Sequence, residues 1–203
     1  MKQIYKFVIT GGPCAGKTTA LNILKESLSK SGFKVLTVPE SATEIFSIGL
    51  SLNETPILTI QDLILKKMLH SEDFVENIAN TLDFNNENII IFYDRGILDS
   101  KAYVPYEDFL TVLNNNGLDE EKAIKRYDAV FHLVTAANGA EEFYTLENNS
   151  TRLETAEEAC SLDLRTITAW QTHPNLYIFD NSTNFDEKIN HLISKVIEIV
   201  KTY

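Results

Sequence analysis

A glycine-rich turn between two apolar segments is the feature that most restricts how this chain can fold. Residues 9–19 read ITGGPCAGKTT, and they lie between the apolar run IYKFVIT and a segment with leucines at helical spacing. Gly11, Gly16, Lys17 and Thr18 fit the pattern G-x-x-x-x-G-K-[ST] in the strand-to-helix context that the pattern requires. Such a turn points consecutive backbone N–H groups inward, next to the positive end of the following helix. The sequence therefore predicts an anion-binding loop of the kind that holds phosphates.

Nine consecutive residues make up the predicted nucleotide-binding loop. They are Gly11, Gly12, Pro13, Cys14, Ala15, Gly16, Lys17, Thr18 and Thr19. Lys17 is expected to reach the outer phosphates of a nucleoside triphosphate, and the Thr18 hydroxyl is expected to bind Mg²⁺. A chance match in a chain of this length is expected on the order of once in a hundred sequences, so an accidental turn is the weaker interpretation.

Five short apolar runs predict the strands of one sheet. They are residues 4–10, 35–38, 89–93, 129–134 and 176–179. Their hydrophobicity is nearly continuous rather than alternating, which is typical of a parallel sheet covered by helices on both faces. A chain of 203 residues with 44% hydrophobic content can bury one sizeable core. We therefore expect an α/β fold with a single nucleoside-triphosphate-binding domain over residues 1–203, in which residues 138–155, rich in turn formers, act as a lid.

Charge and composition exclude several classes of partner. The formal net charge of −11 and the pI near 4.8 argue against nucleic acid or an anionic membrane surface as the main partner. No apolar stretch approaches the length of a membrane span, and the glycine loop begins too early to leave room for a signal peptide. Cys14 and Cys160 are the two cysteines, which fits a reducing compartment. The cytoplasm is the expected location.

Acidic residues follow two of the predicted strands. Asp94 comes directly after the third strand, and Glu40 follows the second in the stretch VLTVPESATE. A hydrophobic strand that ends in Asp is the Walker B pattern, whose carboxylate faces Mg²⁺, so Asp94 is a predicted metal ligand rather than a simple turn cap. Glu40 suits a base that takes a proton from an acceptor hydroxyl. A cap on the helix that SATEIF begins is an equal alternative for Glu40.

Arginines are scarce and therefore informative. The chain has Arg95, Arg126, Arg152 and Arg165, and arginine binds phosphoryl oxygens in a bidentate manner with a fixed charge. Arg95 lies beside the presumed metal carboxylate, and Arg152 lies on the predicted lid, from which it would swing over the phosphates. Lys17, Glu40, Asp94, Arg95 and Arg152 are thus the predicted catalytic residues. Arg165 could join them, whereas Arg126 is expected to form a structural ion pair.

Other polar and aromatic residues give weaker signals. His132 and Trp170 are expected in the core, because apolar residues surround both of them in the sequence. The four histidines show no metal-ligand spacing, so structural zinc is not expected. Side chains that could line an acceptor pocket, but that the sequence does not distinguish from ordinary surface, are Gln61, Asp62, Tyr103 and Tyr106.

Six stretches of the chain together carry a family resemblance: GGPCAGKTT, VPESATE, YDRGILDSKAY, RYDAVFHLVTAANGAEEFYT, NNSTRLETAEEA and HPNLYIFDN. They resemble the AAA-type P-loop domain shared by the nicotinamide riboside kinase portion of NadR and the translocation-defect protein group. The likeness runs over roughly residues 4–185. It implies a P-loop kinase-like three-layer αβα sandwich with five parallel strands in the order 2-3-1-4-5 and a lid segment.

A more distant likeness to the deoxynucleoside kinases concerns the two acidic strand ends. In those enzymes a Pro-Glu after the second strand supplies the base, and an acid-Arg pair after the third binds metal and substrate. The corresponding positions here are Glu40, Asp94 and Arg95. Larger relatives carry a second, polyphosphate-type domain after the P-loop domain, and an activity that depends on it is not expected of a chain that ends at Tyr203. The lid holds a single arginine, Arg152, where related kinases often carry several.

Two functions remain open from the sequence. The first is a kinase that uses Mg²⁺ with ATP or GTP and phosphorylates an unidentified small molecule with a nucleoside-like hydroxyl. The second is a nucleotide-dependent switch or slow NTPase that acts through a protein partner. A Ras-like version of the second is weakened because the guanine-reading tetrapeptide N-K-x-D is absent from the sequence. Stimulation of turnover by an acceptor would distinguish the two.

Overall fold

Five parallel strands form the centre of the molecule. The computed structural model describes residues 3–83, 88–143 and 155–202. Within them the sheet has the order β2-β3-β1-β4-β5, and each neighbouring pair of strands is parallel. The strands are β1 (Ile4–Thr10), β2 (Lys34–Val38), β3 (Ile89–Asp94), β4 (Ala129–Leu133) and β5 (Leu176–Phe179). The predicted strands and the predicted sheet order are therefore confirmed.

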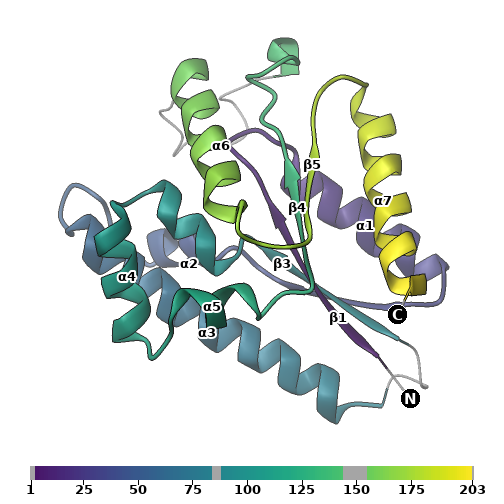
Figure 1. The fold of residues 1–203 in the computed structure, drawn as a ribbon, viewed down its shortest axis with the longest axis horizontal. Helices are drawn as coiled ribbons and strands as arrows, with labels where there is room; N and C mark the ends of the chain where they lie inside the picture. The colour runs from purple at the N-terminus through teal and green to yellow at the C-terminus, as the bar shows by residue number, and fades with distance from the viewer. Residues whose placement is uncertain (1–2, 84–87, 144–154, 203) are drawn as a thin grey trace.

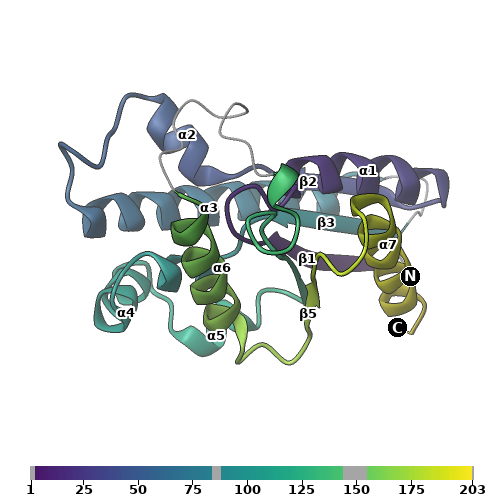
Figure 2. The same ribbon diagram turned by 90° about the horizontal axis from the view of Figure 1, so that it is seen from above.

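Helices connect the strands and cover the sheet. They are α1 (Lys17–Lys30), α2 (Ser41–Ser47), α3 (Ile57–Thr81), η1 (Ile97–Ala102), α4 (Tyr106–Asn115), α5 (Glu120–Ile124), η2 (Glu141–Phe143), α6 (Ala156–Trp170) and α7 (Phe185–Thr202). The long α3 accounts for the helical pattern that precedes β3 in the sequence, and the short α2 lies alongside it (Figure 2). Gly32, with a φ of 87°, follows the C-cap Ser31 at the end of α1, where a left-handed glycine commonly ends a helix.

The sheet is buried on both faces, which explains why its strands lack a polar side. On β1, Phe7 and Ile9 pack with residues of α1 and α7, whereas Val8 packs on the other face with residues of α3, α4 and α6. Figure 1 accordingly shows α1 and α7 on one side of the strands and α3 and α4 on the other. This arrangement is the expected αβα sandwich, with a separate apolar cluster on each face of the sheet.

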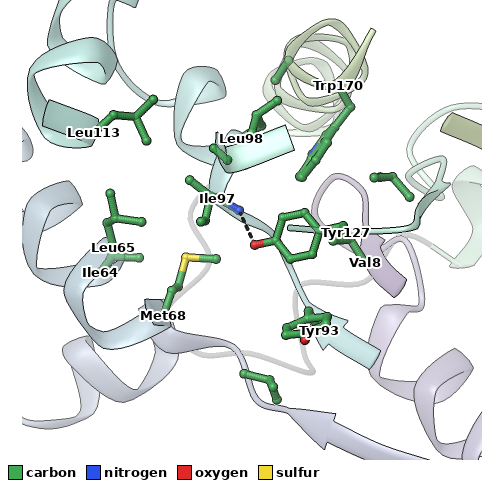
Figure 3. Packing of buried hydrophobic residues seen from close by; sticks show 14 of the residues in the cluster. Val8, Ile64, Leu65, Met68, Tyr93, Ile97, Leu98, Leu113, Tyr127 and Trp170 are labelled. Carbon is green, nitrogen blue, oxygen red and sulfur yellow. Dashed lines mark hydrogen bonds between the residues drawn. The ribbon is translucent and has the colours of Figure 1, made fainter. Parts of the chain in front are cut away.

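A buried polar network joins α3 to the segment that follows β3. Tyr127 donates a hydrogen bond to Glu72 at 2.7 Å, and its hydroxyl accepts the backbone N–H of Ile97 at 3.2 Å (Figure 3). Arg126 donates to Glu72 at 2.8 Å and to Asp73 at 3.0 Å. The expected structural ion pair of Arg126 is therefore confirmed. The network also fixes the start of η1, which lies two residues beyond Arg95.

Strand register brings the predicted site residues to one edge of the sheet. Ile9 pairs with Asp94, and Val38 pairs with Tyr93, so the carboxyl ends of β1, β2 and β3 lie side by side. Ligands gather at this edge in open α/β sheets. Arg152 and most of the predicted lid, residues 144–154, lie outside the described residues. Within the described part of the chain, no helix combines the length and the apolar character needed to cross a membrane.

Candidate nucleotide-binding site

Two glycines of the loop between β1 and α1 are required by close contacts. Gly11 has a φ of 145°, and a Cβ there would lie 2.1 Å from the carbonyl oxygen of Leu133. Gly16 has a φ of 78°, and a Cβ there would lie 2.6 Å from the ring of Phe185. Only glycine adopts such conformations and fits such spaces without strain. The loop therefore wraps closely against β4 and against the first residue of α7.

Lys17 lies folded over the same loop. Its ammonium donates to the carbonyl oxygens of Gly11 at 3.0 Å and Gly12 at 2.9 Å. The side chain is buried, and burial, together with the nearby Arg95 guanidinium, lowers the pKa of Lys17 to about 8 although the Asp94 and Glu40 carboxylates oppose the shift. A phosphate at the loop would give this ammonium a better partner than two carbonyl groups.

Asp94 and Thr18 line a cavity of about 180 Å³ beside the loop. Among the described residues, Oδ1 of Asp94 is buried and accepts no hydrogen bond. Burial raises the pKa of Asp94 to about 6, because desolvation of the carboxylate outweighs the attraction of Lys17. An orphaned carboxylate oxygen next to a hydroxyl fits Mg²⁺, which prefers oxygen ligands and keeps several waters. The two residues could therefore hold this ion together with phosphate oxygens.

Glu40 forms an ion pair with Arg95 at the carboxyl ends of β2 and β3. The Nε of Arg95 donates to Glu40 at 2.5 Å, and the hydroxyl of Thr43 donates to the other carboxylate oxygen at 2.7 Å. Burial alone would raise the pKa of Glu40, but Arg95 and Thr43 overcome it and lower the pKa to about 2. Glu40 occupies the N-cap position of α2 without a side-chain cap bond. Its side chain is thus shared between Arg95 and the Thr43 hydroxyl in the first turn of α2, and it accepts no backbone N–H of that helix.

Arg95 is held in an unusual backbone conformation beside the phosphate loop. Its φ of 74° lies in the left-handed region, which costs a residue with a Cβ on the order of 1 kcal/mol. Its Nη1 donates weakly to the carbonyl oxygen of Gly11 at 3.4 Å. Burial opposes the charge of the guanidinium, but Tyr103, Glu40 and Asp99 outweigh burial and raise the pKa of Arg95. Arg95 therefore connects Glu40 to the loop that holds Lys17.

A comparison with known families agrees with this geometry. A family model described as an AAA domain matches residues 6–188, which include the glycine loop, both acidic strand ends and α6. The chain belongs to this AAA domain family. The glycine loop is accordingly the P-loop of a nucleotide-binding, NTPase-like domain, as the matched family and the sheet order indicate. No curated protein matches the chain.

The P-loop of this AAA domain has a support that the sequence analysis missed. Asp163 of α6 is buried, and its Oδ1 accepts the backbone N–H of Gly12 at 2.7 Å, that of Thr135 at 3.3 Å and Nε2–H of His132 at 3.0 Å. The hydroxyl of Thr135 in turn donates to the carbonyl oxygen of Pro13. His132 is therefore a buried residue with a polar partner. No spacing rule connects Asp163 to a loop that lies so far away in the sequence.

Another buried polar group, on α7, links the loop after β4 to the loop after β5. The ammonium of Lys188 donates to the carbonyl oxygen of Val134 at 3.0 Å and to the side chain of Asn181 at 2.8 Å. Asn181 donates to the carbonyl oxygens of Thr135 at 2.8 Å and Asn138 at 2.7 Å. Burial lowers the pKa of Lys188 to about 8. The segment after β5 is thereby fixed against the loop after β4.

Several other candidates lie apart from the P-loop or serve in packing. Asp62 accepts from Lys66 and Asn116 between α3 and α4. Tyr106 donates to Glu120, and together with Arg165 it lines a separate cavity of about 400 Å³ between α4 and α6. Gln61 is buried in α3, and Trp170 is in the core as expected. Tyr103 is 40% exposed and has an electrostatic influence on Arg95.

Proposed function

We propose that this AAA domain transfers the terminal phosphoryl group of ATP or GTP to a hydroxyl group of a small, nucleoside-like acceptor. The observation that carries the proposal is the Glu40–Arg95 ion pair at 2.5 Å, whose guanidinium also reaches the Gly11 carbonyl of the P-loop. A carboxylate and an arginine at this point face the place where the outermost phosphate would lie. A carboxylate in this place can orient either an acceptor hydroxyl or a water molecule. The likeness of Glu40, Asp94 and Arg95 to the corresponding residues of the deoxynucleoside kinases is what favours the hydroxyl.

The P-loop residues, Gly11 to Thr19, bind the nucleotide in this proposal. Their backbone N–H groups and the start of α1 hold the phosphates, and the Lys17 ammonium leaves the carbonyl oxygens of Gly11 and Gly12 to contact the outer phosphates. Thr18 and Asp94 hold Mg²⁺ beside the cavity that they share. When bound, this ion neutralises charge on the phosphate oxygens and orients them.

Glu40 accepts the proton of the acceptor hydroxyl, and Arg95 contacts the transferred phosphoryl group. A carboxylate with a pKa of about 2 is ionised at neutral pH but binds a proton weakly. As the Arg95 guanidinium moves from Glu40 to the phosphoryl oxygens, Glu40 loses its cation and becomes a stronger base at the moment when the proton must leave. Tyr103, which acts electrostatically on Arg95, is the acceptor-pocket candidate that this proposal keeps.

The lid of residues 138–155 closes over the phosphates, and Arg152 on it adds a second guanidinium to the transferred group. This part of the proposal depends on the sequence, because Arg152 lies outside the described residues. Closure would exclude water and so favour transfer over hydrolysis. The proposal treats the chain as one P-loop domain with its own lid.

The decisive experiment measures release of ADP and GDP from Mg·ATP and Mg·GTP, first alone and then with a panel of nucleosides that includes nicotinamide riboside. Strong stimulation by one compound would establish a kinase and name its acceptor class. Slow release that no compound changes would contradict the proposal and favour a switch or NTPase that works with a protein partner.

Glu40→Gln provides the matching test of mechanism. It should lower transfer by roughly 10² to 10⁴, the usual contribution of a general base, while nucleotide affinity stays close to the parental value. Glu44→Gln is a suitable control, because Glu44 lies on the same helix and pairs with Lys67 at 2.8 Å near the surface. Transfer at the parental rate in Glu40→Gln would remove Glu40 from the chemistry.

A further inference from the structure

Asp99 is a buried carboxylate directly behind Arg95 that the proposed chemistry does not use. Only 4% of Asp99 is exposed. It accepts a hydrogen bond from the hydroxyl of Thr10, with oxygen distances of 2.7 and 2.9 Å, and one from Nε1–H of Trp170 at 2.6 Å. Thr10 is the last residue of β1, and Trp170 is the last residue of α6. Asp99 therefore joins the start of the P-loop to the end of α6.

The same carboxylate closes the turn that directly follows Arg95. The N–H of Gly96 donates to Asp99 Oδ2 at 3.3 Å, and the backbone N–H of Asp99 donates to the Gly96 carbonyl oxygen at 3.0 Å. A Cβ on Gly96 would lie 2.7 Å from the ring of Trp170, so this turn is pressed against α6. These reciprocal bonds hold the peptide that joins Arg95 to Gly96, and the N–H of Arg95 donates to the carbonyl oxygen of Ile9 at 3.0 Å. The left-handed backbone of Arg95, which an arginine would otherwise avoid, is thus held on both sides.

Charge adds to the effect of the turn. Nη1 of Arg95 lies 3.7 Å from Asp99 Oδ2, and its Nε lies 2.5 Å from Glu40. Two carboxylates thus hold the guanidinium from two directions. If Arg95 leaves Glu40 to contact a phosphoryl group, Asp99 is the carboxylate that remains beside it.

We propose that Asp99 is a positioning residue that keeps the Arg95 guanidinium at the P-loop, both through the turn that it closes and through its charge. The use of Arg95 in transfer rests on the proposed function, whereas the hold of Asp99 on Arg95 is a property of the protein without substrate. The link extends to α6, since Asp163 of the same helix accepts from Gly12. One helix thereby fixes the distance between the P-loop and Arg95.

The test follows the arginine side chains directly by NMR on protein labelled with ¹⁵N-arginine. Asp99→Asn removes the charge beside Arg95 and replaces one carboxylate oxygen by an amide N–H₂, which cannot accept from Thr10, Gly96 or Trp170. The turn and the guanidinium should therefore loosen, and exchange of the Arg95 Nε–H with water should become faster on the order of tenfold. Arg126 gives an internal control, since its Nε–H donates to Glu72 at 2.8 Å far from Asp99. Asp62→Asn is the matched control variant, because Asp62 accepts from Lys66 and Asn116 elsewhere. An unchanged Arg95 Nε–H in folded Asp99→Asn would overturn the proposal.

Trp170→Phe serves if Asp99→Asn does not fold. It removes one donor and leaves the carboxylate in place, so it should accelerate exchange at Arg95 in the same direction but by a smaller factor. No acceleration in this variant would overturn the proposal equally.

The turnover arm separates this proposal from the proposed function. If transfer is found, Asp99→Asn should lower it with little change in Mg·ATP affinity, and it should cause no further loss in an Arg95→Ala background; additive losses would contradict action through Arg95. If no acceptor is found, the kinase proposal fails while the exchange of Arg95 Nε–H still decides the role of Asp99.

Discussion

Removal of the Asp163 carboxylate tests how the P-loop is held in place. In Asp163→Ala, three donors lose their acceptor: the N–H of Gly12 at 2.7 Å, Nε2 of His132 at 3.0 Å and the N–H of Thr135 at 3.3 Å. Each buried donor left without a partner costs about 1 to 3 kcal/mol. Because the third bond is long and water can enter the space left behind, we expect a total loss of roughly 3 to 5 kcal/mol in the free energy of unfolding. The melting temperature should fall by on the order of 10 °C for a domain of this size.

Urea unfolding and Mg·ADP titration measure the two consequences separately. Asp163→Asn should recover part of the stability, since its amide oxygen can still accept from Gly12. Asp73→Ala is the surface control, because Asp73 pairs with Arg126 but its side chain is 71% exposed, so its removal should cost less than about 1 kcal/mol. Nucleotide affinity should fall in Asp163→Ala and stay parental in Asp73→Ala. If Asp163→Ala unfolds within about 1 kcal/mol of the parent and binds Mg·ADP equally well, the assignment of Asp163 as a support of the P-loop is wrong.

Three further outcomes are expected. Glu40→Gln should lower the free energy of unfolding by roughly 2 kcal/mol at pH 7. Because the pKa of Glu40 is lowered from 4.5 to about 2, this contribution exists above pH 4.5 and fades as the pH falls toward 2. Urea titrations from pH 7 to 3.5 should show a shrinking difference in stability between the parent and the variant. Mg·ADP binding should take up a proton above pH 8, because the pKa of Lys17 is lowered to about 8 in the free protein and a bound phosphate would raise that pKa. Calorimetry at pH 9 in buffers of different ionisation enthalpy would detect the proton uptake. Equal binding heats in all buffers would contradict the prediction. Gly96→Ala should cost about 1 to 3 kcal/mol through overpacking, since its Cβ would lie 2.7 Å from Trp170, whose emission should shift.

Local signals were sufficient to find the strands. Each strand is a short apolar run bounded by loop residues, and the faces of β1 that hold Phe7 and Val8 are both buried, which is what continuous hydrophobicity predicts. The sheet order did not come from periodicity but from the family resemblance. The extent of α3 as one long helix was not predictable, because the two apolar sets that precede β3 fit one helix or two. These sets are Ile60, Ile64 and Met68, and Val75, Ile78 and Leu82.

The candidate site was predictable where its residues belong to one short segment or end a strand. Gly11, Lys17, Asp94 and Glu40 meet at the edge of the sheet for that reason, and their catalytic roles stay predictions. Asp163 was not found, because its function depends on the packing of α6 against a loop distant in the sequence. A buried Asp in a helix next to Leu162 was the available signal, and a charged residue among apolar neighbours implies a partner without identifying it.

The P-loop lies among more carboxylates than cations, and this imbalance leads to a last prediction. Lys17 and Arg95 donate to carbonyl oxygens of the loop. Glu40, Asp94 and Asp99 all act on the Lys17 ammonium, and the Arg95 guanidinium is already shared between Glu40 and Asp99. A triphosphate that enters without a metal therefore meets net repulsion, and the pKa of Asp94, raised to about 6, already reflects the cost of an unpaired carboxylate.

Asp94→Asn should consequently change nucleotide affinity in opposite directions. Without the carboxylate, metal-free ATP in EDTA should bind more tightly than to the parent, by roughly threefold to tenfold for one repulsive charge at partly screened range. Mg·ATP should bind more weakly by a similar factor or more, because a metal ligand is lost. The free protein should also gain stability at pH 7, since the raised pKa means that ionised Asp94 destabilises the folded state as the pH rises from 3.8 through about 6. Titrations of both proteins with ATP in Mg²⁺ and in EDTA provide the comparison. Equal loss of both affinities would show that Asp94 supports the shape of the loop rather than holding the ion.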